Sequence, residues 1–164
     1  MKHPIGHTSN GFPVYVDLIH SQAAQHISSK PHLLTLVKEA VKQIKVTGPE
    51  LKIEYDMGHP IGYDFVVQTT DEHTILYAQI LREDIYTRFA KNGRPVATSY
   101  LTMVLRHDTD NGYELHDTWI GRIHPPRPGS DSETPESKSY WENHAYILDA
   151  QQLQIRTVTK VCPY

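Results

Sequence analysis

Apolar residues recur between Pro31 and Val46 with the spacing of one face of an α-helix. Pro31 suits the first turn of such a helix, and Thr47-Gly48-Pro49 ends the run. The pattern therefore predicts a helix from about Pro31 to Val46. Its apolar face consists of Leu33, Leu36, Val37, Ala40, Val41 and Ile44.

From Leu51 onward the apolar period changes to two, which is typical of strands with one buried face. The earlier run from Phe12 to Ile19 is also mainly apolar and is predicted to be an edge strand. The later strands are predicted through Tyr63, Phe65 and Val67, from Ile75 to Ile80, from Tyr86 to Ala90, and through Leu153, Ile155, Thr157, Thr159 and Val161.

The clearest hairpin joins Ser99–Arg106 to Tyr113–Gly121. Asp110-Asn111-Gly112 lies between the two alternating runs, and these residue types tolerate positive φ in tight turns. In the second strand, strict alternation places His116 on one face with Glu114, Thr118 and Ile120. These strands predict an antiparallel meander.

After Gly121 the composition changes, because Arg122 to Pro135 contains four prolines and no apolar periodicity. A connection of this length is either mobile or functional. Thr134-Pro135-Glu136 then has the order of an N-cap, a first-turn proline and a first-turn acid, so a helix is predicted through Trp141 and His144. The fold class expected is α+β, with one antiparallel sheet of about five to six strands, the N-terminal helix packed on it, and a second helix after the proline-rich loop.

Composition is consistent with an ordinary folded domain. The chain has 164 residues, 38% of them hydrophobic and 21% charged, and residues 1–164 are expected to form a single domain with one core. No stretch of 18 apolar residues occurs, and the first residues lack the apolar segment of a signal peptide. We therefore expect a cytoplasmic protein with no membrane partner. The one cysteine, Cys162, allows neither an internal disulfide nor a cysteine-based zinc site.

Several kinds of chemistry have no support in the sequence. The histidine pairs His3/His7, His20/His26 and His116/His124 lack the helical spacing and nearby glutamate of a zinc protease, so no metal is expected. There is no Gly-x-Ser-x-Gly nucleophile motif, no Walker motif and no Gly-x-Gly-x-x-Gly, so no cofactor is expected either. The formal charge of −3 excludes binding of nucleic acid by bulk electrostatics, and any recognition of phosphate must be local.

A group of basic, hydroxyl and aromatic residues remains within the predicted meander. RNA cleavage without metal requires a base, an acid and cations that stabilise the charge on the phosphorane, and these residue types supply all three. On a strand, Tyr86 and Arg88 share one face and Thr87 lies on the other. His116 and His144 are the nearest histidines, and Arg122 follows the His116 strand. Arginines and lysines at such strand and turn positions are usually only solvated, and His144 is equally consistent with a packed position beside Trp141. The group consists of Arg82, Tyr86, Thr87, Arg88, Lys91, Arg94 and Thr98.

The segment from Gly62 to Leu148, a little over half of the chain, resembles the nuclease-like domains of phage and polymorphic toxins that are grouped with the barnase, EndoU, colicin and RelE ribonucleases. This resemblance implies a helix on an antiparallel sheet and RNA cleavage without metal. It implies that Arg82 and Arg88 hold the scissile phosphate, that Thr87 or Thr98 assists, and that His144 is base or acid. The resemblance is carried by Asp64–Thr70, Tyr77–Arg82, Tyr86–Phe89, Pro95–Thr102, Tyr113–Leu115, Ile120-Gly121, Pro135–Lys138 and Tyr140–Ala145.

The function expected is therefore a metal-independent endoribonuclease of toxin type that leaves a 2′,3′-cyclic phosphate. Its substrate is RNA, contacted by Tyr86, Lys91, His116 and Arg122, and a toxin of this kind requires a neutralising partner such as an acidic antitoxin. Two other classes stay open. One is a non-catalytic interaction module of a phage or mobile element that uses the loop from Arg122 to Pro135. The other is a small-ligand-binding domain whose pocket is lined by some of the ten tyrosines.

Overall fold

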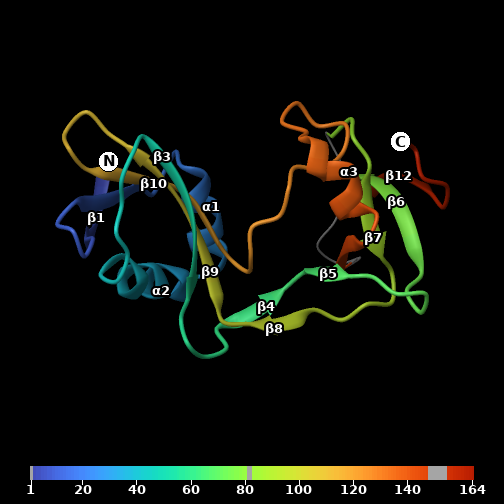
Figure 1. Ribbon diagram of the computed structural model, residues 1–164, viewed down its shortest axis with the longest axis horizontal. Helices are drawn as coiled ribbons and strands as arrows, with labels where there is room; N and C mark the ends of the chain where they lie inside the picture. The colour runs from blue at the N-terminus through green and yellow to red at the C-terminus, as the bar shows by residue number, and fades with distance from the viewer. Residues whose placement is uncertain (1, 81–82, 148–154) are drawn as a thin grey trace. The chain divides into compact units, whose positions relative to one another are not determined.

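The computed structural model describes residues 2–80, 83–147 and 155–164, except for the side chains of residues 155–157 (Figure 1). The chain separates into two compact units. Unit 1 contains Met1–Tyr63 and Ala97–Ile123, and unit 2 contains Asp64–Val96 and His124–Tyr164. Each unit has its own sheet, and the two are described separately. The expectation of a single folding domain stays a prediction.

Unit 1 is a five-stranded sheet covered by two helices. The strand order is β1-β2-β10-β9-β3, and α1 and α2 pack beside it (Figure 1). The bounds are β1 Lys2–His7, β2 Pro13–Asp17, α1 Gln22–Ser29, α2 His32–Val41, β3 Glu50–Asp56, β9 Tyr100–His107 and β10 Tyr113–Ile120.

The core of unit 1 forms where the apolar faces of both helices meet the sheet. Ser21 begins α1, because its Oγ accepts a hydrogen bond from the Ala24 N–H at 3.1 Å. Deep burial of these apolar side chains supplies most of the stabilisation of such a layer. The fully buried members include Val16, Ala23, Leu33, Val37, Ala40, Val41, Leu101, Met103, Leu105 and Leu115.

The predicted hairpin is present as β9 and β10, and Asn111 in its turn has φ of 62°. The strict alternation predicted for β10 is wrong, because a β-bulge lies between Leu115 and Asp117. The extra residue moves Thr118 onto the core face with Leu115, and both are fully buried. His116 lies at the bulge and does not share a face with Thr118.

Unit 2 is a second five-stranded sheet, in the order β12-β6-β7-β11-β5, and α3 packs against β11 (Figure 1). Thr134 and Ser137 begin α3, since Ser137 Oγ accepts from the Thr134 N–H at 3.0 Å. A further two-stranded sheet pairs β4 with β8 where the chain passes between the units. The bounds are β4 Gly62–Asp64, β5 Val66–Gln68, β6 Ile75–Ile80, β7 Thr87–Ala90, β8 Val96–Thr98, α3 Pro135–Trp141, β11 His144–Ile147 and β12 Ile155–Thr159.

The mixed helix-and-strand class is as predicted, but the structure divides the strands between two large sheets instead of one. The N-terminal helical region contains two helices, α1 and α2. Helix α2 ends at Val41, so the predicted end at about Val46 is too late. Ile44 is buried although it lies beyond the helix, which is why an apolar residue occurs there. The second predicted helix ends at Trp141, and His144 lies on strand β11.

No helix among residues 2–80, 83–147 and 155–164 is both long enough and apolar enough to cross a bilayer.

Candidate functional site

The predicted site residues are divided between the two units. Thr87, Arg88 and His144 lie on β7 and β11 of unit 2, with Tyr86 and Lys91 at the two ends of β7. Thr98, His116 and Arg122 belong to unit 1. Arg82 lies outside the described residues.

Two of the three residues in unit 1, Thr98 and Arg122, make hydrogen bonds within that unit. The buried Thr98 accepts a hydrogen bond from the Tyr100 N–H at 3.1 Å through Oγ1. Arg122 donates to Glu54 Oε2 through Nε at 3.2 Å and Nη2 at 3.0 Å, and its guanidinium lies 4.3 Å from the centre of the Tyr100 ring. These contacts fix the ends of strands, while His116 occupies the bulge of β10.

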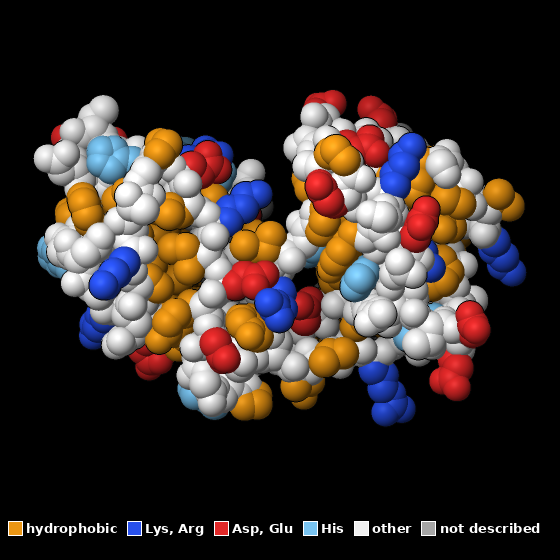
Figure 2. All heavy atoms as spheres, viewed as in Figure 1, with side chains coloured by type: hydrophobic (Ala, Val, Ile, Leu, Met, Phe, Trp, Pro, Cys, Tyr) orange, Lys and Arg blue, Asp and Glu red, His pale blue; other side chains and the backbone are white. Residues whose placement is uncertain are grey.

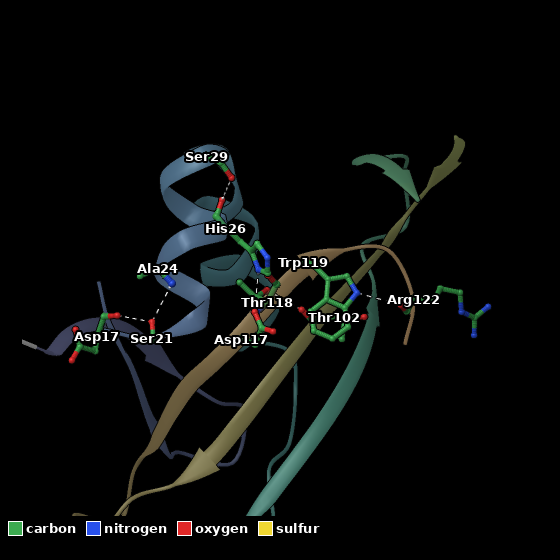
Figure 3. A network of polar contacts seen from close by, with 10 residues as sticks. All are labelled: Asp17, Ser21, Ala24, His26, Ser29, Thr102, Asp117, Thr118, Trp119 and Arg122. Atoms are coloured by element: carbon green, nitrogen blue, oxygen red, sulfur yellow. Dashed lines mark hydrogen bonds and ion pairs between the residues drawn. The ribbon is translucent and has the colours of Figure 1, made fainter. Parts of the chain in front are cut away.

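A histidine that the sequence did not single out for catalysis holds α1 to β10. Figure 3 shows the ring of His26 directed at the bulge, where Nδ1 lies 3.0 Å from Asp117 Oδ1 and 2.8 Å from the carbonyl oxygen of Thr118. Hydrogen bonding to the Asp117 carboxylate raises the pKa of His26. This pair stabilises the packing of a helix on a strand.

In unit 2, the side chains of Arg88 and His144 leave the sheet on opposite faces. Tyr146 is paired with Phe89 in parallel register, and paired residues share a face. His144, two residues before Tyr146, is therefore on the Phe89 face, whereas Arg88 is on the other. Their one contact runs from Arg88 Nη1 to the backbone oxygen of His144, at 3.0 Å. The predicted phosphate-binding arginine and the predicted catalytic imidazole are not brought together.

Thr87, on the Phe89 face, binds an arginine that the sequence analysis did not select. Arg127 Nη1 donates both to Thr87 Oγ1 and to Glu83 Oε2, each at 2.6 Å, and its Nη2 lies 3.2 Å from Glu83 Oε1. Thr87 is 1% exposed, whereas the Arg127 and Glu83 side chains retain 25% and 34% of their exposure. The guanidinium and the carboxylate are thus partly open to solvent, and the guanidinium is also bound to a buried hydroxyl.

His124 and Tyr146 form a second pair on this face. Nε2 of His124 lies 3.3 Å from the Tyr146 hydroxyl, and Nδ1 lies 3.4 Å from the carbonyl oxygen of Pro125. A carbonyl only accepts, so this arrangement assigns the proton to Nδ1 and the lone pair to Nε2. Burial raises the pKa of Tyr146 to about 12, while the positive charge of Arg127 opposes that shift. The phenol therefore stays protonated at neutral pH and donates to Nε2.

His144 completes the face. Its Nδ1 lies 2.8 Å from the carbonyl oxygen of Tyr140, and its ring stacks on Tyr140 with centroids 3.9 Å apart and an interplanar angle of 3°. The proton is again assigned to Nδ1, which leaves Nε2 as the basic nitrogen. We call Glu83, Thr87, His124, Arg127, His144 and Tyr146 the Arg127 cluster.

Four members of the Arg127 cluster, namely Glu83, His124, Arg127 and Tyr146, were not selected from the sequence. His124 and Arg127 come from the proline-rich loop, whose length was the available signal. The loop is held in place, because Trp141 Nε1 donates to the Pro125 oxygen at 3.1 Å and Arg127 binds Glu83. No sequence spacing indicates that Glu83 and Arg127 meet, since they are far apart along the chain.

Within the part of the chain that the structure describes, no group of three or more histidine, cysteine, aspartate and glutamate side chains is arranged to hold a metal ion. Unit 1 has an open hollow of about 520 Å³ whose lining includes Phe12, His107 and Tyr113. Tyr113 is the one tyrosine in that lining, so the tyrosines do not converge on it.

Charge is distributed locally. On the face shown in Figure 2, lysine and arginine side chains are interspersed with acidic ones over both units. On this face a polyanion would meet individual basic groups and not a broad basic surface.

Comparison of the chain with protein-family models, with curated proteins and with solved structures gives no match. A functional conclusion therefore depends on the chemistry of the Arg127 cluster. It contains a carboxylate, two imidazoles, a guanidinium, a phenol and a hydroxyl on one face of one sheet.

Proposed function

We propose that the chain is a metal-independent endoribonuclease of toxin type, and that the Arg127 cluster is its active site. The observation that carries this proposal is the position of Arg127, whose guanidinium binds Glu83 and Thr87 on the face that also bears His124 and His144. A cation, a carboxylate and imidazoles are the groups that cleavage through a 2′,3′-cyclic phosphate requires.

In this proposal the 2′-oxygen of the RNA attacks the adjacent phosphorus while a base accepts its proton. The bond from phosphorus to the 5′-oxygen breaks, and an acid protonates that oxygen. Glu83 and the Nε2 atoms of His124 and His144 are the candidate base and acid groups. Arg127 stabilises the charge on the phosphorane, and the Thr87 hydroxyl orients Arg127.

Arg127 also explains how the resting site and the substrate complex differ. Its Nη1 is shared between two acceptors, and a phosphate oxygen is a third acceptor of the same kind. When phosphate takes one of these hydrogen bonds, the Glu83 carboxylate is less strongly paired with Arg127 and has an oxygen free to accept a proton from the 2′-hydroxyl. Tyr86 and Lys91, at the ends of β7, are proposed to contact the RNA backbone beside the site.

The test is cleavage of end-labelled RNA in excess EDTA, with analysis of the product ends. Wild type is expected to leave cyclic or 3′-phosphate ends, and Arg127→Ala, His124→Ala and Glu83→Gln are expected to lose most of this activity. Arg94→Ala is the matched control, because Arg94 is an exposed arginine of the same unit. Thr87→Val and Thr98→Val form a second pair, in which only Thr87→Val is expected to be impaired.

Absence of EDTA-resistant cleavage between about pH 5 and pH 8, where histidine changes charge, would refute the ribonuclease. Equal activity of wild type and Arg127→Ala would refute the site.

A non-catalytic interaction module is the second candidate, and the pairing of the loop arginines favours it. Arg122 binds Glu54 and Arg127 binds Glu83, so both loop arginines are engaged with acids. A loop held by such contacts is preorganised to bind a protein. Under this alternative, replacing the exposed segment Asp131–Glu133 with glycine and serine abolishes partner binding, and no variant cleaves RNA.

A further inference from the structure

Arg88 points away from the Arg127 cluster, onto the opposite face of the sheet in unit 2. That face is apolar, and its buried members Val67, Ala90, Ala145 and Ile147 form one cluster. Arg88 is half-buried at the edge of this surface. A guanidinium is always charged in a protein, so the site places a positive charge beside an apolar surface.

The hydrogen-bond partners of Arg88 are neutral. Nη1 donates to Thr69 Oγ1 at 2.9 Å and to the His144 carbonyl oxygen at 3.0 Å. Nε is buried and has no hydrogen-bond partner among residues 2–80, 83–147 and 155–164. Within those same residues no carboxylate lies within 4.0 Å of the guanidinium, whereas Arg106, Arg122 and Arg127 each have one.

A charge in this position needs compensation. Removing an ion from water costs several kcal/mol even after relaxation, and an ion pair with good geometry offsets that cost. Neutral acceptors offset only part of it. Among the described residues the guanidinium has no carboxylate and its Nε–H has no acceptor, and an anion bound beside Arg88 would compensate its charge.

Two hydroxyl groups stand beside the guanidinium. Tyr77 is directly opposite Arg88 in the antiparallel pair of β6 and β7, so the two side chains share a face. Burial raises the pKa of Tyr77, and the phenol therefore keeps its proton at neutral pH even though hydrogen bonding to Arg88 opposes the shift. The Thr69 hydroxyl accepts from Arg88, which leaves its own hydrogen to donate.

We propose that Arg88, Tyr77 and Thr69 form a binding site for a phosphate group. The half-buried guanidinium supplies the charge and its accessible N–H donors, and the two hydroxyls supply further donors. A phosphate has more acceptor oxygens than a carboxylate has, so this set of donors fits phosphate better. The site is on the opposite face of the sheet from the Arg127 cluster, and it therefore does not depend on the proposed ribonuclease activity. The phosphate belongs either to inorganic phosphate or to a mononucleotide.

The experiment is titration of the purified full chain with inorganic phosphate, acetate and a 5′-mononucleotide at constant ionic strength. Binding is followed by calorimetry and by the shift in the melting temperature. Wild type is expected to bind phosphate and to bind acetate more weakly. Tighter binding of the mononucleotide identifies a nucleotide as the source, and equal binding identifies free phosphate.

The variants assign the binding to the three side chains. Arg88→Gln is expected to abolish it, and Tyr77→Phe to weaken it by about tenfold, the equivalent of one charge-assisted hydrogen bond of about 1.4 kcal/mol. Arg94→Gln, in an exposed turn of the same unit, is the matched control and is expected to bind like wild type. If Arg88→Gln does not fold, Tyr77→Phe and Thr69→Val carry the test.

Two results would overturn the proposal: no phosphate binding by wild type, or binding that survives unchanged in Arg88→Gln. RNA cleavage is assayed separately, so its failure leaves the result at Arg88 unaffected.

Discussion

Arg88 and His144 lie on adjacent strands of one sheet, and the Arg88 guanidinium donates to the His144 backbone oxygen at 3.0 Å, yet their side chains occupy opposite faces. The two residues are neighbours in the sheet, but the guanidinium and the imidazole are on opposite sides of it. The face of His144 carries the Arg127 cluster, and the face of Arg88 carries the proposed phosphate site. Substitutions at these two positions should have separable effects.

Removal of the Arg127 side chain should destabilise unit 2. Arg127→Ala removes the hydrogen bonds that the guanidinium donates to the buried Thr87 hydroxyl and to the Glu83 carboxylate. The expected loss is about 1–3 kcal/mol in the free energy of unfolding, measured by urea denaturation. Arg94→Ala should change the stability by less than about 0.5 kcal/mol, as exposed sites do. Equal stability of the two variants would contradict the assigned contacts.

Replacement of Arg88 by an apolar side chain should not destabilise unit 2, in contrast to the removal of Arg127. In Arg88→Met the uncompensated charge is removed while much of the packing volume is kept, so the free energy of unfolding should be unchanged or higher in phosphate-free buffer. Adding phosphate should raise the melting temperature of wild type and leave that of Arg88→Met unchanged. A loss above about 3 kcal/mol, typical of a broken buried ion pair, would mean that Arg88 already has its counter-charge within the chain.

The pair of His26 and Asp117 makes the stability of unit 1 depend on pH. The pKa of His26 is raised above the ordinary value of 6.5, mainly by its hydrogen bond to Asp117. The protonated form therefore stabilises the folded state below pH 6.5, and this contribution is lost as the pH rises through the higher folded pKa. Wild type should thus exceed Asp117→Asn in free energy of unfolding by more at pH 5.5 than at pH 8. The change in this difference should be up to about 1 kcal/mol, as for one partly exposed ion pair. A difference that does not change with pH would contradict this assignment.

The two tryptophans allow the cooperativity of the chain to be measured. Trp119 is in unit 1 and Trp141 is in unit 2, and the chain contains no other tryptophan. Each unit is built from two separate segments, so neither is complete until the chain has passed through the other. Trp119→Phe keeps only the tryptophan of unit 2, and Trp141→Phe keeps only that of unit 1. In each variant we expect the urea midpoint from tryptophan fluorescence to equal the midpoint from far-UV circular dichroism, which follows both units. Distinct midpoints within one variant would show that the units unfold independently.

Local signals in the sequence predicted local structure well. The hairpin turn was predicted because Asn111 tolerates positive φ, and β6 was predicted with its observed bounds. The start of α3 followed from Thr134 and Pro135. Each of these features is decided by residues close together in the chain, and their conformational preferences are present in the sequence itself.

Features that depend on distant residues were not predictable in this way. Strict alternation of apolar and polar residues does not predict the bulge at His116. The bulge places Thr118 on the face opposite to the one predicted. β11 is so short that its pattern was taken for the end of a helix, although pairing with β5 and β7 holds His144 in a strand. The division of the strands between two sheets likewise depends on pairing across long stretches of chain.

The sequence by itself determined the helix-and-strand class, the positions of most elements, and the long proline-rich loop between β10 and α3. Only the tertiary structure decided which side chains meet. Arg127 reaches Glu83 and Thr87 because the loop after β10 packs over β7, and Arg88 is separated from His144 because a sheet has two faces. Periodicity encodes which residues share a face within one strand, but strand pairing and loop packing, which involve residues far apart in the chain, determine which faces come together.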